Sequence, residues 1–303
     1  MGHGVIQRLL SFFLLASAMR VAQENPQPQQ IAPIDLVRLA VTREVAAANQ
    51  PGVYHMFRSY KKTPKGTQTH LYVETSEAMG GMLIAANDQP LNAQQQQAEK
   101  NRLYWLSGNP DQLKKKRARE KDDAERTLRI VRSLPYAFRF EYAPLQPGDE
   151  QLVKSGEELV RLNFTPNPTY SPPSRVEQVL QGMRGYLLID ATARRIARID
   201  GTLFRDVSFG WGIVGHLDKG GHFVVRQAEV GGGSWEIIEM SLQITGKILL
   251  LKSINMTSDE KFSDFQPVPN DLTFAKGVDL LLAEQEKLAR NAQGESQANK
   301  NQR

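Results

Sequence analysis

The stretch WEIIEMSLQIT, residues 235–245, alternates apolar and polar side chains. The apolar set is Ile238, Met240, Leu242 and Ile244, and the polar set is Glu239, Ser241, Gln243 and Thr245. Successive side chains of a β-strand point to opposite faces of its sheet. The pattern therefore predicts a strand that is covered on one face only, as in an antiparallel sheet.

Further strand-like runs occur on both sides of this stretch. They lie at residues 53–61, 70–77, 138–142, 159–165, 186–190, 195–199, 202–209, 222–230 and 247–256. Glycine or polar residues separate neighbouring runs, and the three glycines at 231–233 predict a hairpin turn. Such close spacing predicts a meander of antiparallel strands.

Two runs, residues 186–189 and 248–251, are apolar on both faces. A strand of this kind needs cover on both sides of its sheet. We expect helices on one side and, on the other, more sheet, a loop or a bound apolar molecule. Tyr186, Leu188 and Leu250 are therefore candidate contacts for an apolar ligand.

Helical patterns accompany the strands. Apolar residues recur at helical spacing in residues 34–48, and a last amphipathic helix is expected at 278–290. Residues 88–134 are rich in helix formers, and Asn109-Pro110 divides them, which predicts an insertion of two helices. The polar residues 291–303 have little to bury, so we expect a disordered tail.

The first residues have the composition of a secretory signal. Arg8 supplies a positive charge, residues 9–15 are apolar, and Ala16-Ser17-Ala18 is a small-x-small cleavage motif. An apolar run of about ten residues is shorter than the roughly 20 needed to span a bilayer, which favours cleavage over a membrane anchor. The pattern predicts an exported, periplasmic chain that is soluble after cleavage, with segments at 1–18 (signal peptide), 19–33 (flexible tether), 34–277 (β-rich domain) and 278–303 (last helix and tail).

Composition narrows the function classes. The 303-residue chain has no cysteine, which excludes disulfides, thiolate catalysis and thiolate metal sites. The 38 basic and 33 acidic residues give a modest net charge of +5, so we expect no nucleic-acid partner. The basic run Lys114–Arg119 is followed closely by acidic residues, which predicts a solvated helix face whose functional use would be attraction to anionic lipid headgroups.

The segment FGWGIVGHLDKGGHF, residues 209–223, contains a G-x-G-x-x-G match. A dinucleotide fingerprint must follow a parallel strand and open a helix, whereas this one leads into another strand. We interpret it as a glycine-rich connection whose apolar side chains form a lip over an apolar pocket; the alternative is a loop folded against its own core. These side chains are Trp211, Ile213, Val214 and Leu217.

No catalytic constellation is evident. The sequence lacks a G-x-S-x-G elbow and an HExxH motif. His216, Asp218 and His222 offer metal-ligand chemistry, but surface or strand positions are the preferred interpretation. We expect no enzyme activity, no metal and no cofactor.

The order of these elements resembles the superfamily of LolA-, LolB- and RseB-type periplasmic proteins, and most closely its uncharacterised outer-membrane lipoprotein-sorting-like members. The resemblance covers roughly residues 34–266 and is carried by residues 184–190, 195–199, 208–220, 246–252 and 262–265. It implies an α+β fold: a half-open antiparallel β-barrel of about ten strands with helices over its concave face, enclosing an apolar cavity. The charged insertion 88–134 and the polar tail depart from the family's best-known carriers.

The resemblance and the strand pattern predict a non-enzymatic carrier or sensor of the acyl chains of lipids or lipoproteins. The alternative is an envelope protein-binding sensor or scaffold whose sheet is filled by its own side chains. Further candidate partners are an anionic membrane surface and envelope proteins. We expect a monomer.

Overall fold

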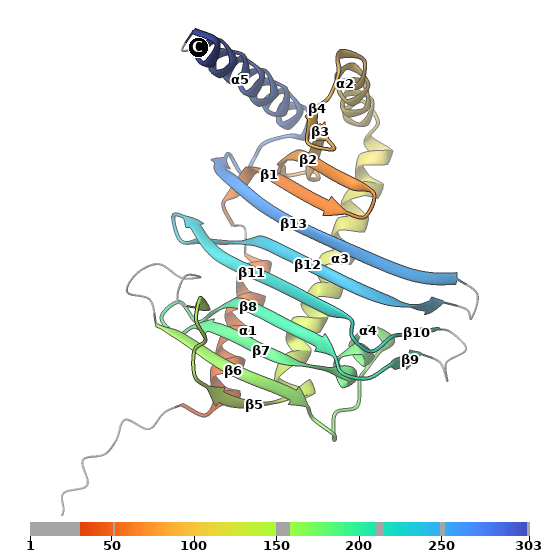
Figure 1. The fold of residues 1–303 in the computed structure, drawn as a ribbon, viewed down its shortest axis with the longest axis vertical. Helices are drawn as coiled ribbons and strands as arrows, with labels where there is room; N and C mark the ends of the chain where they lie inside the picture. The colour runs from red at the N-terminus through yellow and green to blue at the C-terminus, as the bar shows by residue number, and fades with distance from the viewer. Residues whose placement is uncertain (1–30, 51, 150–157, 210–214, 249–251, 302–303) are drawn as a thin grey trace, which may run out of the picture. The chain divides into compact units, whose positions relative to one another are not determined.

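The computed structural model describes residues 31–50, 52–149, 158–209, 215–248 and 252–301. Residues Ala32–Arg303 form one compact unit. Its described part has an α+β fold, in which five α-helices accompany a single antiparallel sheet of thirteen strands (Figure 1). The predicted class is confirmed, with three strands more than the ten expected.

The thirteen strands of the described residues follow one another closely along the chain. They are β1 (Tyr54–Thr63), β2 (Gly66–Val73), β3 (Gly80–Ala86), β4 (Gln89–Pro90), β5 (Phe138–Ala143), β6 (Leu159–Pro166), β7 (Met183–Asp190), β8 (Arg195–Leu203), β9 (Val207–Phe209), β10 (Gly215–Leu217), β11 (His222–Gly231), β12 (Ser234–Ile248) and β13 (Lys252–Val268). Their order in the sheet is β4-β3-β2-β1-β13-β12-β11-β8-β7-β6-β5, and β10 joins β9 to β12. In the described residues β4 and β5 are the two edges and do not pair, so the sheet is not closed into a barrel.

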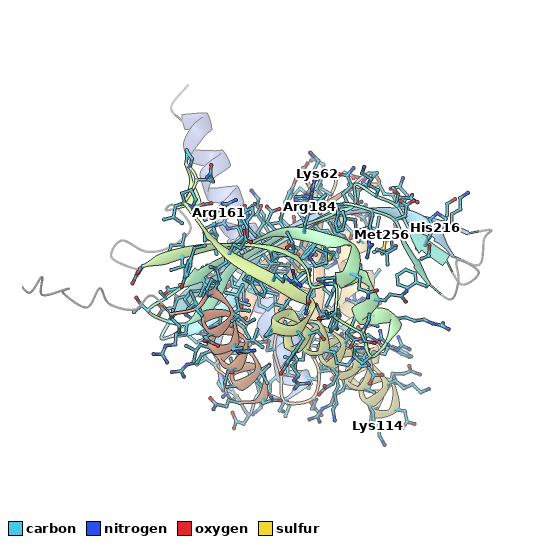
Figure 2. The ribbon with its side chains drawn as sticks, turned by 90° about the horizontal axis from the view of Figure 1, so that it is seen from below. Lys62, Lys114, Arg161, Arg184, His216 and Met256 are labelled. Carbon is cyan, nitrogen blue, oxygen red and sulfur yellow. The ribbon has the colours of Figure 1, made fainter. Side chains whose placement is uncertain are left out.

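The α-helices of the described part are α1 (Pro33–Asn49), α2 (Ala93–Ser107), α3 (Pro110–Ala137), α4 (Arg175–Gln178) and α5 (Phe274–Asn301). Helices pack at both ends of the sheet, and α3 runs between the two ends, with α2 at one end and α1, α4 and β5 at the other (Figure 1). Helices α1 and α3 contact each other and lie on the same face of the sheet (Figures 1 and 2). Helices α2 and α5 contact each other and β3 at the opposite end.

Local sequence explains where the helices begin. Pro33 and Pro110 occupy the first turns of α1 and α3, where a missing N–H costs nothing. Asn92 and Gln95 form a reciprocal capping box at the start of α2. The predicted division at Asn109-Pro110 is confirmed, because α2 ends at Ser107 and α3 begins at Pro110.

The main core lies between α1 and the strands β6 to β8. Leu187, Ile189 and Ile196 are at most 1% exposed there. They pack with the buried side chains of α1, which are Leu36, Val37, Ala40 and Val41. This half of the sheet is a solid core.

A second core lies between α5 and the other face of the sheet, around β1 and β2. Cross-strand pairs place Lys61 on the same face as Ile199, a neighbour of the α1 core. Met56 differs from Lys61 by an odd number of positions in β1, so it points to the opposite face. Met56 packs in a cluster with Val278 and Leu281 of α5. The two main cores therefore lie on opposite faces, at opposite ends of one sheet.

Two predicted strands prove to be divided. Residues 202–209 are split because β8 ends at Leu203, and β9 then pairs with β10 instead of continuing along β8. Residues 247–256 are split because β12 ends at Ile248 and β13 begins at Lys252, which pairs with Ile248 across the hairpin. Neither run contains a glycine or proline that marks the division, so the pattern reads as continuous.

The sequence also underestimates the last helix and the edge of the sheet. The predicted disordered tail is wrong over residues 291–301, because α5 continues through Asn301; six of these eleven residues are helix-forming Ala, Gln, Glu or Lys. Strands β3 and β4 precede α2 and are absent from the prediction, and β4 falls within the predicted helical insertion 88–134. The hairpin at 231–233 is confirmed, with Gly232 and Gly233 at φ values of 60° and 80°.

Candidate functional site

An apolar stripe crosses the α1-side face of the central strands. Its members alternate along β11, β12 and β13 and are paired across them: Phe223, Val225, Met240, Leu242, Ile244, Ile254 and Met256. We call this set the central stripe. None of its members is fully buried, and Met240 and Met256 are 39% and 53% exposed. An exposed apolar surface of this kind is typical of a site that takes an apolar partner.

The stripe is partly exposed although α3 runs past this face of β11, β12 and β13 (Figure 1). Helix α1 contacts chiefly β8 and β5, and α2 and α5 contact β2 and β3, whereas helix contact with β11, β12 and β13 is at most marginal in the described residues. The alternation at residues 235–245 predicts one covered face for β12. The apolar face is present, but its cover is incomplete.

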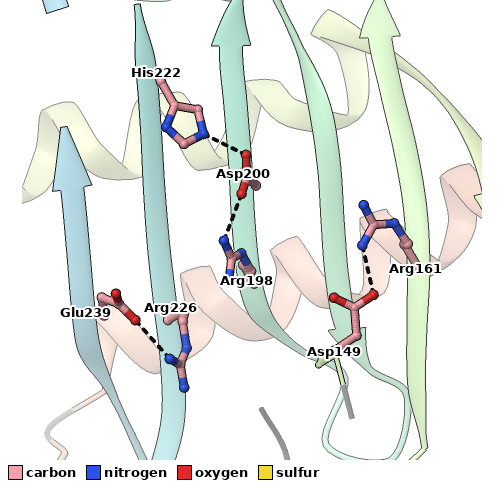
Figure 3. Close-up of polar contacts among 7 residues, drawn as sticks. All are labelled: Asp149, Arg161, Arg198, Asp200, His222, Arg226 and Glu239. Atoms are coloured by element: carbon pink, nitrogen blue, oxygen red, sulfur yellow. Dashed lines mark hydrogen bonds and ion pairs between the residues drawn. The ribbon is translucent and has the colours of Figure 1, made fainter. Parts of the chain in front are cut away.

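The opposite face of the same strands carries charge pairs (Figure 3). Arg226 donates to Glu239 at 2.8 Å, and Asp200 lies 2.8 Å from Arg198 and 2.9 Å from His222. Burial alone would raise the pKa of the Asp200 carboxyl, but its hydrogen bonds with His222 and Arg198 outweigh burial and lower that pKa. These polar side chains cover the face opposite the stripe, and an apolar ligand bound there would remove them from water at a cost in free energy.

The strands β12 and β13 separate at one end of the sheet. Their pairing ends at Glu239 and Lys261; beyond it β12 pairs only with β11, and β13 only with β1. We call this separation the fork. A cavity of about 660 Å³ adjoins it, lined by the end of α1, the β7–β8 turn and the β11–β12 hairpin. Trp235 lines the cavity and precedes Met240 of the stripe by about 16 Å along β12.

Two carboxyl groups and an imidazole meet beside this cavity. The Nδ1 atom of His55 lies 3.6 Å from Glu236 and 3.9 Å from Glu74. The His55 side chain is 5% exposed, and its Nδ1 atom has no hydrogen-bond partner. Burial raises the pKa of Glu74 to about 7, against a backbone hydrogen bond from His55, and burial also raises the pKa of Glu236. The cluster can therefore hold a proton near neutral pH.

The structure describes only one of the four side chains of the predicted lip, Leu217. Trp211, Ile213, Val214 and Leu250 lie outside the described residues. Leu217 is half-buried in β10 and packs against the α1 core. The described flanks of the G-x-G-x-x-G match are the antiparallel strands β9 and β10, and no helix follows it, as the connecting-loop interpretation expects.

Leu188 and Tyr186 lie on the face opposite the stripe. Leu188 is 0% exposed and packs with Leu159 and Ala197. The guanidinium of Arg161 lies 3.5 Å from the centre of the Tyr186 ring. The predicted double cover of β7 is confirmed, but Leu145 and other side chains of this chain supply the second layer. The structure therefore does not bring these two residues together with Leu217 or with the stripe.

The histidines considered as metal ligands have separate partners. His216 lies 3.2 Å from Asp218, and His222 pairs with Asp200. Among the residues that the structure describes, no cluster of three or more His, Asp or Glu side chains has a geometry that could hold a metal ion.

The sequence pattern indicates part of the stripe but not the fork. The alternation in residues 235–245 marks Met240, Leu242 and Ile244, but it cannot reveal that helices leave them exposed. His55 of β1 and Glu74, which follows β2, meet through the local β1–β2 hairpin. Glu236 comes from β12, and only the long-range order of strands brings it to them.

Comparison of this chain with protein-family models, with curated proteins and with solved structures finds no significant match. No helix in the described ranges has the length and apolar character needed to cross a membrane.

Proposed function

We propose that this protein is an exported, non-enzymatic carrier or sensor that binds acyl chains of lipids or lipoproteins. The central stripe carries the proposal, because it offers apolar side chains from three adjacent strands that remain partly exposed and have at most marginal helix contact in the described residues. Met240 and Met256 suit this role, since the flexible, polarizable methionine side chain adapts to ligands of different shape.

The energetics of such binding need no covalent step. Burying one methylene group contributes about 0.8 kcal/mol, so a chain of about 14 carbons offers on the order of 10 kcal/mol before the costs of ordering. The stripe follows the strand direction over several residues of β12, which suits an extended chain. The fork cavity at the beginning of β12 provides polar groups, including Glu236 and Ser234, for a headgroup.

We further propose that the sheet is a half-open barrel of the LolA, LolB and RseB type. The antiparallel sheet with α1 and α3 on one face supports this proposal. The signal-like composition of residues 1–18 supports export to the periplasm.

Native mass spectrometry of the purified protein, before and after delipidation, tests the proposed function. We expect adducts with the masses of lipids or fatty acids, loss of these adducts on delipidation, and their return when fatty acid is added. A protein that carries no lipid and shows no affinity for fatty acids would refute the proposal.

A second candidate function is an envelope scaffold that binds proteins and holds no ligand. The packed core of β6 to β8 favours it, because Leu187, Leu188 and Ile189 are at most 1% exposed and side chains of this chain cover both faces of β7. The same mass measurement discriminates the two functions. A scaffold would be free of lipid under every condition and would retain its fold.

A further inference from the structure

Two large aromatic side chains are exposed where α2 ends. Tyr104 is 46% exposed and Trp105 is 57% exposed. Leu103 of the same turn is fully buried, and Trp105, two positions later in the helix, points to the opposite side of α2. Trp105 therefore faces away from the core and presents its indole to the surroundings.

The next helix begins with a concentration of positive charge. Residues 110–119 contain five basic residues and one acidic residue, a net charge of +4. Leu113 is buried and Lys116 pairs with Glu120, whereas Lys114, Lys115 and Arg119 are exposed. None of these three forms an ion pair with another described residue.

The turn between the helices holds the aromatic and basic groups close together. Only Gly108 and Asn109 separate α2 from α3. The Gly108 N–H donates to the carbonyl of Tyr104, and the Asn109 side chain donates to the carbonyl of Trp105. We call the exposed surface of residues 104–119 the helical corner.

We propose that the helical corner docks the protein on an anionic lipid bilayer, with Tyr104 and Trp105 at the interface and Lys114, Lys115 and Arg119 over the headgroups. Tyrosine and tryptophan favour the membrane–water interface, where their rings are apolar and their polar atoms stay hydrated. Each lysine or arginine near an anionic surface contributes about 1 kcal/mol of attraction. The combination matches a bilayer in both charge and polarity, and it does not depend on what the sheet binds.

The environment of Trp105 gives a local test. The chain has three tryptophans, so Trp211→Phe with Trp235→Phe leaves Trp105 as the only one. We expect vesicles of phosphatidylglycerol and phosphatidylcholine with brominated acyl chains to quench its fluorescence, and higher salt to reverse the quenching. Vesicles of phosphatidylcholine alone should have little effect. A Trp105 signal that is unchanged by anionic vesicles would overturn the proposal, even if another part of the chain binds them.

Charge-reversal variants supply the matched control. Lys114→Glu with Lys115→Glu should lower the quenching-detected affinity for anionic vesicles about tenfold or more. Lys62→Glu changes an exposed, unpaired lysine on the other side of the sheet from Lys114 and should leave affinity unchanged (Figure 2). Equal effects of the two changes would overturn the proposal, as would tighter binding of a single-stranded polynucleotide than of anionic vesicles.

Discussion

The strands β6 to β8 and the strands β11 to β13 belong to one sheet but differ in how their apolar side chains are covered. Leu187 and Ile189 of β7 are at most 1% exposed beneath α1, whereas Met240 of β12 and Met256 of β13 are 39% and 53% exposed. Both regions have apolar side chains on the same face. The difference lies in where the helices pack, so the strand pattern alone does not decide what is core and what is available to a partner.

The comparison assigns different tasks to the two regions. The covered strands supply stability, because their side chains are removed from water by other parts of the chain. The central stripe keeps part of its apolar surface in contact with water. A ligand that covered this surface would be stabilised by its removal from water. Changes in the first region should affect stability, and changes in the second should affect binding.

The largest expected effect comes from the covered region. Leu187→Ala removes a buried side chain beneath α1 and should lower the free energy of unfolding by about 2–5 kcal/mol. Denaturant titration measures this change, and the remaining folded protein should bind fatty acid normally. A loss below about 1 kcal/mol would mean that this half of the sheet is not the stable core.

The next effect concerns the fork at one end of the central strands. The pKa of Glu74 is about 7 in the folded protein and 4.5 in its unperturbed state, so the folded state binds more protons between these values. Stability should therefore fall as pH rises from about 4.5 to 7, by up to about 3 kcal/mol from this group. Glu74→Gln keeps the size of the side chain but removes its titration. Unfolding measured across this range should show a flatter profile in the variant, and identical profiles would contradict the assignment.

A smaller change in stability is expected in the uncovered region. Met240→Gln with Met256→Gln should alter the free energy of unfolding by less than about 1 kcal/mol, because both side chains are already exposed. Affinity for a fluorescent fatty acid should fall. Gln243→Ala with Thr257→Ala changes a pair on the opposite face of the same two strands and is the matched control. Loss of several kcal/mol in the methionine variant would show that the stripe is core.

The smallest effect is expected on the charged face. Arg226→Gln breaks the pair with Glu239, whose side chains are 25% and 30% exposed. Partly exposed pairs contribute about 0.2–1 kcal/mol, so thermal unfolding should shift only slightly and fatty-acid affinity should stay the same. A change in affinity similar to that of the methionine variant would remove the distinction between the two faces.

The sequence predicts the elements of this fold better than their limits. Local signals predict a boundary correctly where a particular residue type favours a turn or a helix start, as with Gly232 and Gly233 or with Pro110. They fail at residues 247–256, where one apolar run belongs to two strands. They also fail in α5, because polar helix formers extend a helix without the apolar periodicity used to find it.

The candidate site was less predictable than the fold. Periodicity identifies the apolar face that contains Met240, since that information is local. Whether a helix covers this face depends on the packing of α1, about 200 residues earlier in the chain. The same limit explains why Leu188 looks like a ligand contact in the sequence and is buried in the structure. Whether other parts of the chain bury an apolar strand face depends on the whole fold, and the sequence of the strand alone does not determine it.

The central claim is that acyl chains bind along the central stripe, and photocrosslinking tests it most directly. A fatty acid with a diazirine in its chain would be bound to the protein and irradiated, and the labelled residues would be located by mass spectrometry. We expect labels at Met240, Leu242 and Ile244 of β12 and at Ile254 and Met256 of β13, and unlabelled fatty acid should reduce this labelling. Labels confined to β6 and β7, or labelling that unlabelled fatty acid does not reduce, would contradict it.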